Sequence, residues 1–109
     1  MDVDDLNELA GDHLNRARAA AHGRSAVLVL HDGPLRQSLI ALVSGTALSE
    51  HEAPDAGSLL VMRGRVRLES AGGEVEVGEG ELAAIPRERH GLTALADSVV
   101  LLTTVTSID

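Results

Sequence analysis

The residues of this sequence that could do chemistry near neutral pH are its histidines. The chain has five histidines and no cysteine, and His51 and His90 both fall in its strand-rich part. An imidazole binds a transition metal through a ring nitrogen, or moves a proton as a general acid or base. Metal sites usually need three or four protein ligands, so these two imidazoles alone would bind an ion weakly. His51 and His90 are therefore candidate metal ligands, or polar groups at one end of an apolar cavity.

No further metal ligand can be identified with certainty from the sequence. Asp55 lies in a turn and could swing inward, whereas His31 and Gln37 lie on earlier strands and could line a cavity. Strand alternation directs the carboxylates on either side of His51 outward if His51 points inward. We expect His13 and His22, on or just after a helix, to be surface residues.

Other chemistries find little support in the sequence. There is no cysteine nucleophile and no serine in a G-x-S-x-G elbow. The glycine-rich segment Gly78–Glu81 carries acidic side chains, which repel phosphate instead of cradling it. The glutamates of the strands alternate outward, so no carboxylate pair for glycoside chemistry can be assigned. The sequence leaves open whether the protein is an enzyme.

Composition excludes several kinds of partner. The 109 residues have a formal net charge of −8, which disfavours nucleic acid and anionic membrane as partners. No apolar run approaches the roughly 20 residues of a membrane span, and the first ten residues are acidic, unlike a secretory signal. We therefore expect a cytoplasmic protein of one domain. Because there is no Phe, Tyr or Trp, its core must be built from Leu, Val, Ala, Ile and Met.

One helix and a series of short strands must position the histidines. Apolar spacing predicts a helix over Val3–Ala21, with Gly23 as its stop. From Ala26 onward, short apolar or alternating runs separated by turn residues predict an all-β sandwich or barrel. The runs around Arg65–Glu69 and Glu74–Val77 alternate strictly, which predicts a hairpin with one apolar and one charged face.

The first histidine lies in a glycine-flanked motif. Gly45 is followed by five residues and His51, and Gly64 closes the motif. This spacing resembles the first motif of the cupin superfamily, G-x5-H-x-H-x3,4-E-x6-G. The position of the second histidine is Ala53, and the glutamate position falls on Gly57.

The second histidine lies in a motif that resembles the second one of cupins, G-x5-P-x-G-x2-H-x3-N. Gly80 is followed by five residues and Pro86, with His90 close behind. The segment from Pro86 to His90 is one residue shorter than the pattern and lacks its internal glycine, and the last polar position falls near Ala94.

The resemblance covers roughly Ala26 to Val105 and implies a fold. It implies a cupin-like β-barrel, a jelly roll also called a double-stranded β-helix, over residues 25–109, preceded by a short helical segment over residues 1–24. In metal-binding cupins three histidines and one glutamate hold the ion, and only His51 and His90 can be carried over. Cupins commonly pair, and the strand Leu39–Val43 is apolar on both faces. We therefore expect a homodimer, with the helix, a partner subunit or both covering that strand.

Three functions remain as hypotheses. The first is binding of a small molecule in the barrel cavity, near His51 and His90. The second is a metal-dependent cupin enzyme, an oxygenase or isomerase, in which a divalent transition metal has His51 and His90 as two of its ligands. The third is a barrel that has lost its chemistry and serves in assembly. The missing ligands at Ala53 and Gly57 favour the first over the second.

Overall fold

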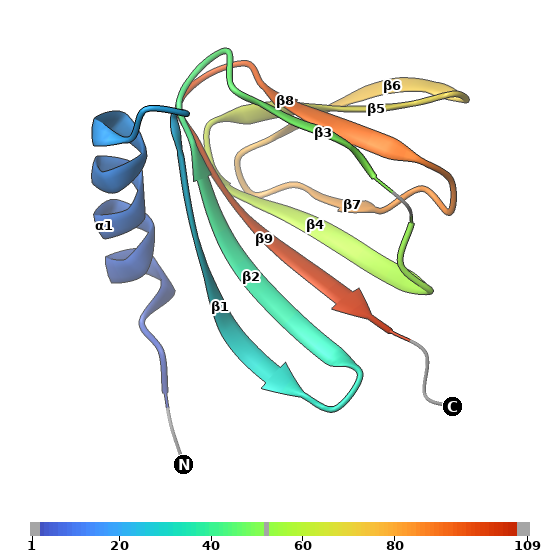
Figure 1. Cartoon of the computed structure of the whole chain (residues 1–109), viewed down its shortest axis with the longest axis horizontal. Helices are drawn as coiled ribbons and strands as arrows, with labels where there is room; N and C mark the ends of the chain where they lie inside the picture. The colour runs from blue at the N-terminus through green and yellow to red at the C-terminus, as the bar shows by residue number, and fades with distance from the viewer. Residues whose placement is uncertain (1–2, 52, 107–109) are drawn as a thin grey trace.

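The chain folds into two antiparallel sheets with one helix packed outside them (Figure 1). The computed structural model describes residues 3–51 and 53–106, with residues 50 and 51 described by their backbone only. The elements are α1 (Leu6–Ala19), β1 (Arg24–Asp32), β2 (Leu35–Leu42), β3 (Ala47–His51), β4 (Ala56–Arg63), β5 (Arg65–Ser70), β6 (Gly73–Gly78), β7 (Leu82–Ala84), β8 (His90–Ala94) and β9 (Ser98–Val105). One sheet has the order β1-β2-β9-β4-β7 and the other β3-β8-β5-β6. The predicted all-β class with an N-terminal helix is confirmed.

The helix is shorter at both ends than the predicted span Val3–Ala21. It begins after Asp5, whose carboxylate accepts hydrogen bonds from the backbone N–H groups of Asn7 and Glu8, both at 3.1 Å. Such a cap satisfies backbone donors that have no partner within the helix. The helix ends at Ala19, and Gly23 lies in the following turn with a φ of 69° instead of ending the helix itself.

The helix covers the outer face of the five-stranded sheet. This helix–sheet core contains Ala10, Leu14 and Ala17 from α1 and Leu39, Ala41 and Val99 from the sheet. Residues of a strand alternate between its two faces, so Ile40 and Leu42 point to the other side, into the space between the sheets. The two-sided apolar strand predicted at Leu39–Val43 therefore has α1 as its cover, and a homodimer stays a prediction.

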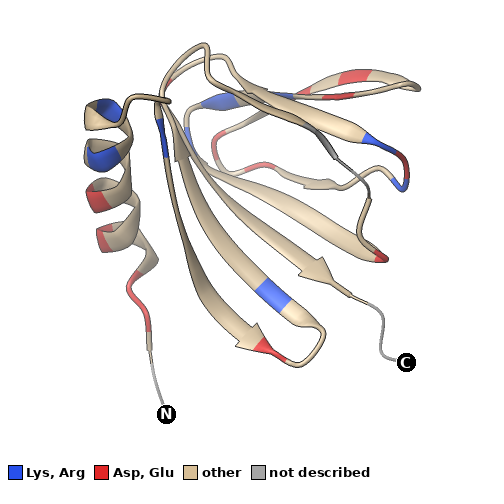
Figure 2. Cartoon of the chain, in the orientation of Figure 1, with Lys and Arg blue, Asp and Glu red and all other residues tan. Residues whose placement is uncertain are grey.

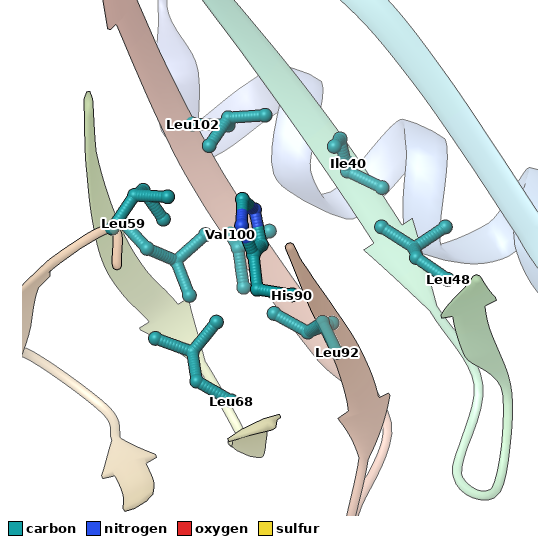
Figure 3. Close-up of a pocket in the computed structure, with 9 residues that line it drawn as sticks. Ile40, Leu48, Leu59, Leu68, His90, Leu92, Val100 and Leu102 are labelled. Atoms are coloured by element: carbon teal, nitrogen blue, oxygen red, sulfur yellow. The ribbon is translucent and has the colours of Figure 1, made fainter. Parts of the chain in front are cut away.

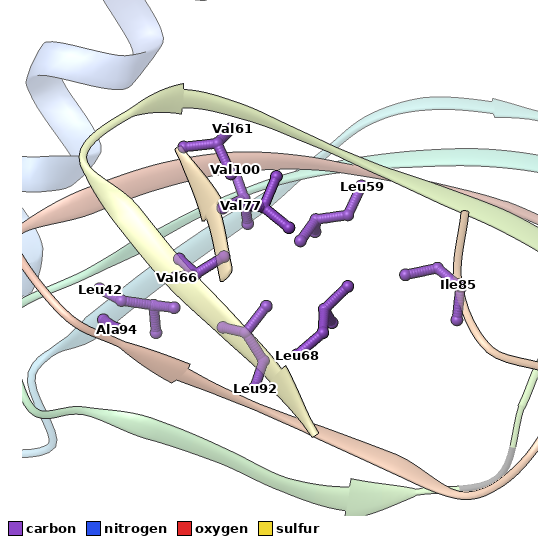
Figure 4. Close-up of a cluster of buried hydrophobic side chains, with 10 residues drawn as sticks. All are labelled: Leu42, Leu59, Val61, Val66, Leu68, Val77, Ile85, Leu92, Ala94 and Val100. Carbon is purple, nitrogen blue, oxygen red and sulfur yellow. The ribbon is translucent and has the colours of Figure 1, made fainter. Parts of the chain in front are cut away.

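A second core fills the space between the two sheets (Figure 4). Its buried members are Leu42, Leu59, Val61, Val66, Leu68, Val77, Ile85, Leu92, Ala94 and Val100. All except Ile85, which follows β7, lie on strands, and both sheets contribute, which is the arrangement of a sandwich or flattened barrel. Small aliphatic side chains replace the aromatic residues that usually fill such a core.

The β5–β6 hairpin has the predicted alternation. Val66 pairs with Val77 across the strands, and Leu68 pairs with Val75. On the charged face the Arg65 Nε lies 2.7 Å from a Glu76 carboxylate oxygen. Val75 departs from the prediction, because it lies on the apolar face yet is 55% exposed at the edge of its sheet. Figure 2 shows how charged residues gather on this hairpin, the helix and the turns, while β9 carries none.

One predicted surface residue is buried. His13 is only 6% exposed, and its Nδ1 lies 2.8 Å from the Ser25 hydroxyl of β1. Positions 10, 13, 14 and 17 share the face of α1 that packs on the sheet, so the surface prediction for His13 was wrong. His22 is exposed, as predicted.

The helix of the structure can be compared with the length that a membrane span requires. Within residues 3–51 and 53–106, no helix has the length and apolar character needed to cross a membrane.

Candidate functional site

His90 is the buried polar residue of the inter-sheet core. It begins β8, is 3% exposed, and lies among aliphatic side chains of both sheets (Figure 3). The cavity beside it is lined by Ile40, Leu59, Val100 and Leu102 from one sheet, Leu48, Leu68 and Leu92 from the other, and Ile85 from the β7–β8 connection. The lining is therefore hydrocarbon apart from one imidazole.

The cavity is small as it stands. Its volume is only about 30 Å³, which is enough for a few water molecules. Leu59, Leu68 and Val100 are nearly fully buried, whereas Ile40, Leu48 and Leu102 are partly exposed. A molecule of more than a few atoms would need side chains on this partly exposed side to move.

The ring of His90 has one nitrogen fixed by the backbone. Nδ1 lies 3.0 Å from the carbonyl oxygen of Glu88. A carbonyl oxygen can only accept, so Nδ1 donates this hydrogen bond and carries the hydrogen. In the neutral ring Nε2 then holds the lone pair, which makes it an acceptor or a metal-ligating atom.

His51 is placed next to His90 by the strand register. β3 and β8 are antiparallel, and His51 and His90 are Cα partners after an irregularity between Leu48 and His51. The side chain of His51 lies outside the described residues. The register therefore brings the two positions side by side, and a site shared by His51 and His90 stays a prediction.

The motif glycines lie where the chain turns. Gly45, Gly64 and Gly80 all take positive φ values, of 87°, 84° and 79°. Gly64, between β4 and β5, is the most constrained, because a Cβ there would overlap the carbonyl oxygen of Asp97 and the hydroxyl of Ser98. These glycines therefore set the turns between strands, and Pro86 lies in the connection that leads to His90.

The described residues do not assemble a metal site. Ala53 has no donor atom in its side chain. A Cβ at Gly57 would meet the Thr103 carbonyl oxygen at 3.0 Å and Ile85 and Pro54 at 3.2 Å, so a glutamate would be crowded there. Among the described side chains, no three His, Cys, Asp or Glu groups gather in a way that could hold an ion. The described donors thus do not fit the ligand set of metal-binding cupins.

The other candidates lie away from the cavity. His31 and Asp55 are exposed. Gln37 points to the outer face of its sheet, where its amide donates to the Thr103 hydroxyl at 3.1 Å. The interpretation of His31 or Gln37 as a cavity residue, and of Asp55 as a swinging ligand, is not supported by these positions.

Two functional residues were not recognised from the sequence. Ile85 closes one wall of the cavity, and Glu88 binds the His90 ring through its carbonyl group. Ile85 ends an apolar run just before Pro86, and this run is the one signal in the sequence for its burial. Glu88 makes its contact through the backbone carbonyl group, which no residue type reveals.

Comparison with known proteins identifies the fold. No protein-family model and no curated protein matches the sequence. A cupin-2 domain protein from Shewanella frigidimarina is 16% identical with a TM-score of 0.70, covering 94% of each chain. A cupin superfamily protein from Desulfitobacterium hafniense is 14% identical with a TM-score of 0.71, covering 77% of this chain and 78% of the other. A protein of unknown function from Rhizobium leguminosarum is 16% identical with a TM-score of 0.72, covering 98% of each chain. At these identities the likeness establishes the fold, and it confirms the resemblance noted in the sequence: this is a small protein with the fold of the cupin superfamily.

Proposed function

We propose that the protein binds a small, largely apolar molecule between its two sheets, next to His90. The observation that carries this proposal is a buried imidazole in a cavity otherwise lined by aliphatic side chains. Binding sites for small molecules have this composition, with an apolar wall and a few polar groups that fix orientation.

The His90 ring sets the polar end of the proposed site. Its Nδ1 is held by the Glu88 carbonyl, so the ring keeps one orientation in the cavity. The polar group of a ligand would lie at this ring while its hydrocarbon part contacts Leu59, Leu92 and Val100. The proposed ligand class is a small alcohol or phenol, which joins one hydroxyl to a hydrocarbon body.

His51 belongs to the proposed site through the register of β3 and β8. In this register His51 is the Cα partner of His90. We assign it the second polar contact of the ligand. A metal-dependent reaction is not proposed, because Ala53 and Gly57 stand where two further ligands would be needed.

Phenol and toluene form a matched pair of probes for this proposal. They have nearly the same size, but only phenol can donate a hydrogen bond. We expect phenol to raise the midpoint of thermal unfolding in calorimetry in a saturable way, and toluene to raise it less. The preference for phenol should vanish in His90→Ala and persist in His22→Ala, which removes an exposed histidine.

Two results would count against the proposal. Equal stabilisation by phenol and toluene would mean that His90 does not contribute a hydrogen bond. An unchanged preference in His90→Ala, with the variant folding cooperatively, would place the binding elsewhere.

A further inference from the structure

A second hollow lies beside the His90 cavity. Its volume is about 270 Å³, and it opens between the tip of the β5–β6 hairpin and the loop from Pro86 to Arg89. We call it the vestibule. Leu68 lines both the vestibule and the cavity, while Ile85 lines the cavity and the next residue, Pro86, lines the vestibule. Leu68 and the start of this loop therefore form the wall between the vestibule and the His90 cavity.

One residue ties this wall together. The Glu88 carboxylate accepts a hydrogen bond from the backbone N–H of Gly72, at the hairpin tip, at 3.2 Å. The Glu88 carbonyl accepts one from Nδ1 of His90 at 3.0 Å. The side chain of Glu88 thus joins the loop to the hairpin, and its backbone joins the loop to the ring in the cavity.

The loop between Ile85 and His90 is fixed at both ends. The loop is anchored at its start, where the Ile85 N–H donates to the Gly57 carbonyl at 2.9 Å, and at its end, where His90 enters β8. The hairpin across the vestibule ends in β6, an edge strand on which Val75 is 55% exposed. The side chain of Glu88 crosses the opening between these two segments.

We infer that Glu88 is a latch: it closes the vestibule entrance to the His90 cavity and positions the His90 ring. Its role in admitting a ligand rests on the proposed function, whereas its control of access to His90 does not. Glu88 acts through His90 and the loop, so it is a positioning residue and not a catalytic one.

Histidine labelling with diethyl pyrocarbonate, read by mass spectrometry, tests the latch without any ligand. The reagent modifies an imidazole nitrogen only when the ring is accessible. Glu88→Ala should raise the labelling rate of His90 by about 2- to 10-fold, the range that corresponds to one net hydrogen bond. Glu88→Gln keeps an oxygen acceptor on a side chain of equal length and should label at close to the unmodified rate.

The other histidines are internal controls. His22 is exposed and should label at the same rate in every variant. His13 is buried in the helix–sheet core, away from the latch, and reports global unfolding. A rise at His90 with a constant rate at His13 supports the latch, whereas a parallel rise at both histidines would overturn it.

A second variant and a second readout address the contact from the hairpin side. A Cβ at Gly72 would lie 3.0 Å from the Glu88 carboxylate oxygen, which must shift by a few tenths of an ångström. Gly72→Ala should therefore weaken the latch and speed His90 labelling by less than Glu88→Ala does. The ¹⁵N chemical shifts of His90 give the second readout. They should show hydrogen on Nδ1 in the unmodified protein and in Glu88→Gln, and a mixture of tautomers in Glu88→Ala.

Unchanged labelling and unchanged shifts in Glu88→Ala would overturn the inference, even if phenol binds. The proposed function fails separately, if phenol gains no preference over toluene.

Discussion

Leu68 separates the cavity from the vestibule, so its truncation gives a quantitative test of the site. The residue is 3% exposed and is the cross-strand partner of Leu92. Leu68→Ala removes three carbon atoms, and at about 0.8 kcal/mol for each buried carbon the transfer cost is about 2.4 kcal/mol. The added cost of an empty cavity should be small, because the vestibule on the other side admits water. We therefore expect a loss of about 2 to 3 kcal/mol, at the low end of the range for buried leucines.

Urea unfolding followed by far-ultraviolet circular dichroism measures this loss, since the chain has no Trp or Tyr for fluorescence. The matched control is Leu14→Ala, which removes the same atoms from the helix–sheet core, where Leu14 is 6% exposed. Both variants should lose stability, but only Leu68→Ala should speed labelling of His90. A loss below about 1 kcal/mol for Leu68→Ala would contradict its place in a packed wall. Equal His90 labelling in the two variants would contradict the separation of the two cores.

Three further predictions concern the scaffold. Gly64→Ala should cost about 3 kcal/mol or more in urea unfolding, because its positive φ and the overlap with the Asp97 carbonyl both penalise a Cβ; a loss below about 1 kcal/mol would show that the turn relaxes freely. The pKa of Asp97 is lowered by its hydrogen bond from the Ser44 backbone N–H and by Arg18. Its stabilisation is therefore present above the ordinary carboxyl pKa and is lost as the pH falls through the lowered value, so Asp97→Asn should flatten the decline of the unfolding midpoint in acid; an unchanged pH profile would contradict this. Asp5→Ala should cost about 1 kcal/mol through loss of the helix cap, measured by the same urea unfolding, and a neutral effect would mean that water replaces the cap.

Much of the fold could be predicted from the sequence because strand alternation is a local property. The hairpin that pairs Val66 with Val77 follows from the alternation of apolar and charged residues alone. The ends of α1 were less accurate, since the apolar spacing continues past both caps. Apolar spacing does not show where an amphipathic helix begins, because a cap such as Asp5 sets that position.

The site was predicted only in outline, because burial and contacts depend on the assembled chain. His90 was found through its spacing from Gly80 and Pro86, whereas the burial of His13 depends on which face of α1 meets the sheet. The contacts of Glu88 with Gly72 and with the His90 ring join segments that no sequence pattern connects. The size of the cavity likewise depends on how the leucines of two sheets meet.

The measurement that tests the central claim most directly is a proton NMR titration of the protein with phenol. Without Phe, Tyr or Trp, the only aromatic ring protons of the chain are those of its five histidines, and His90→Ala identifies the signals of His90. The account predicts saturable shifts of the His90 signals, with magnetisation transfer between its ring and phenol, while His22 stays unchanged. Shifts confined to the exposed histidines, or none at all at saturating phenol, would contradict the claim that this cavity is a binding site.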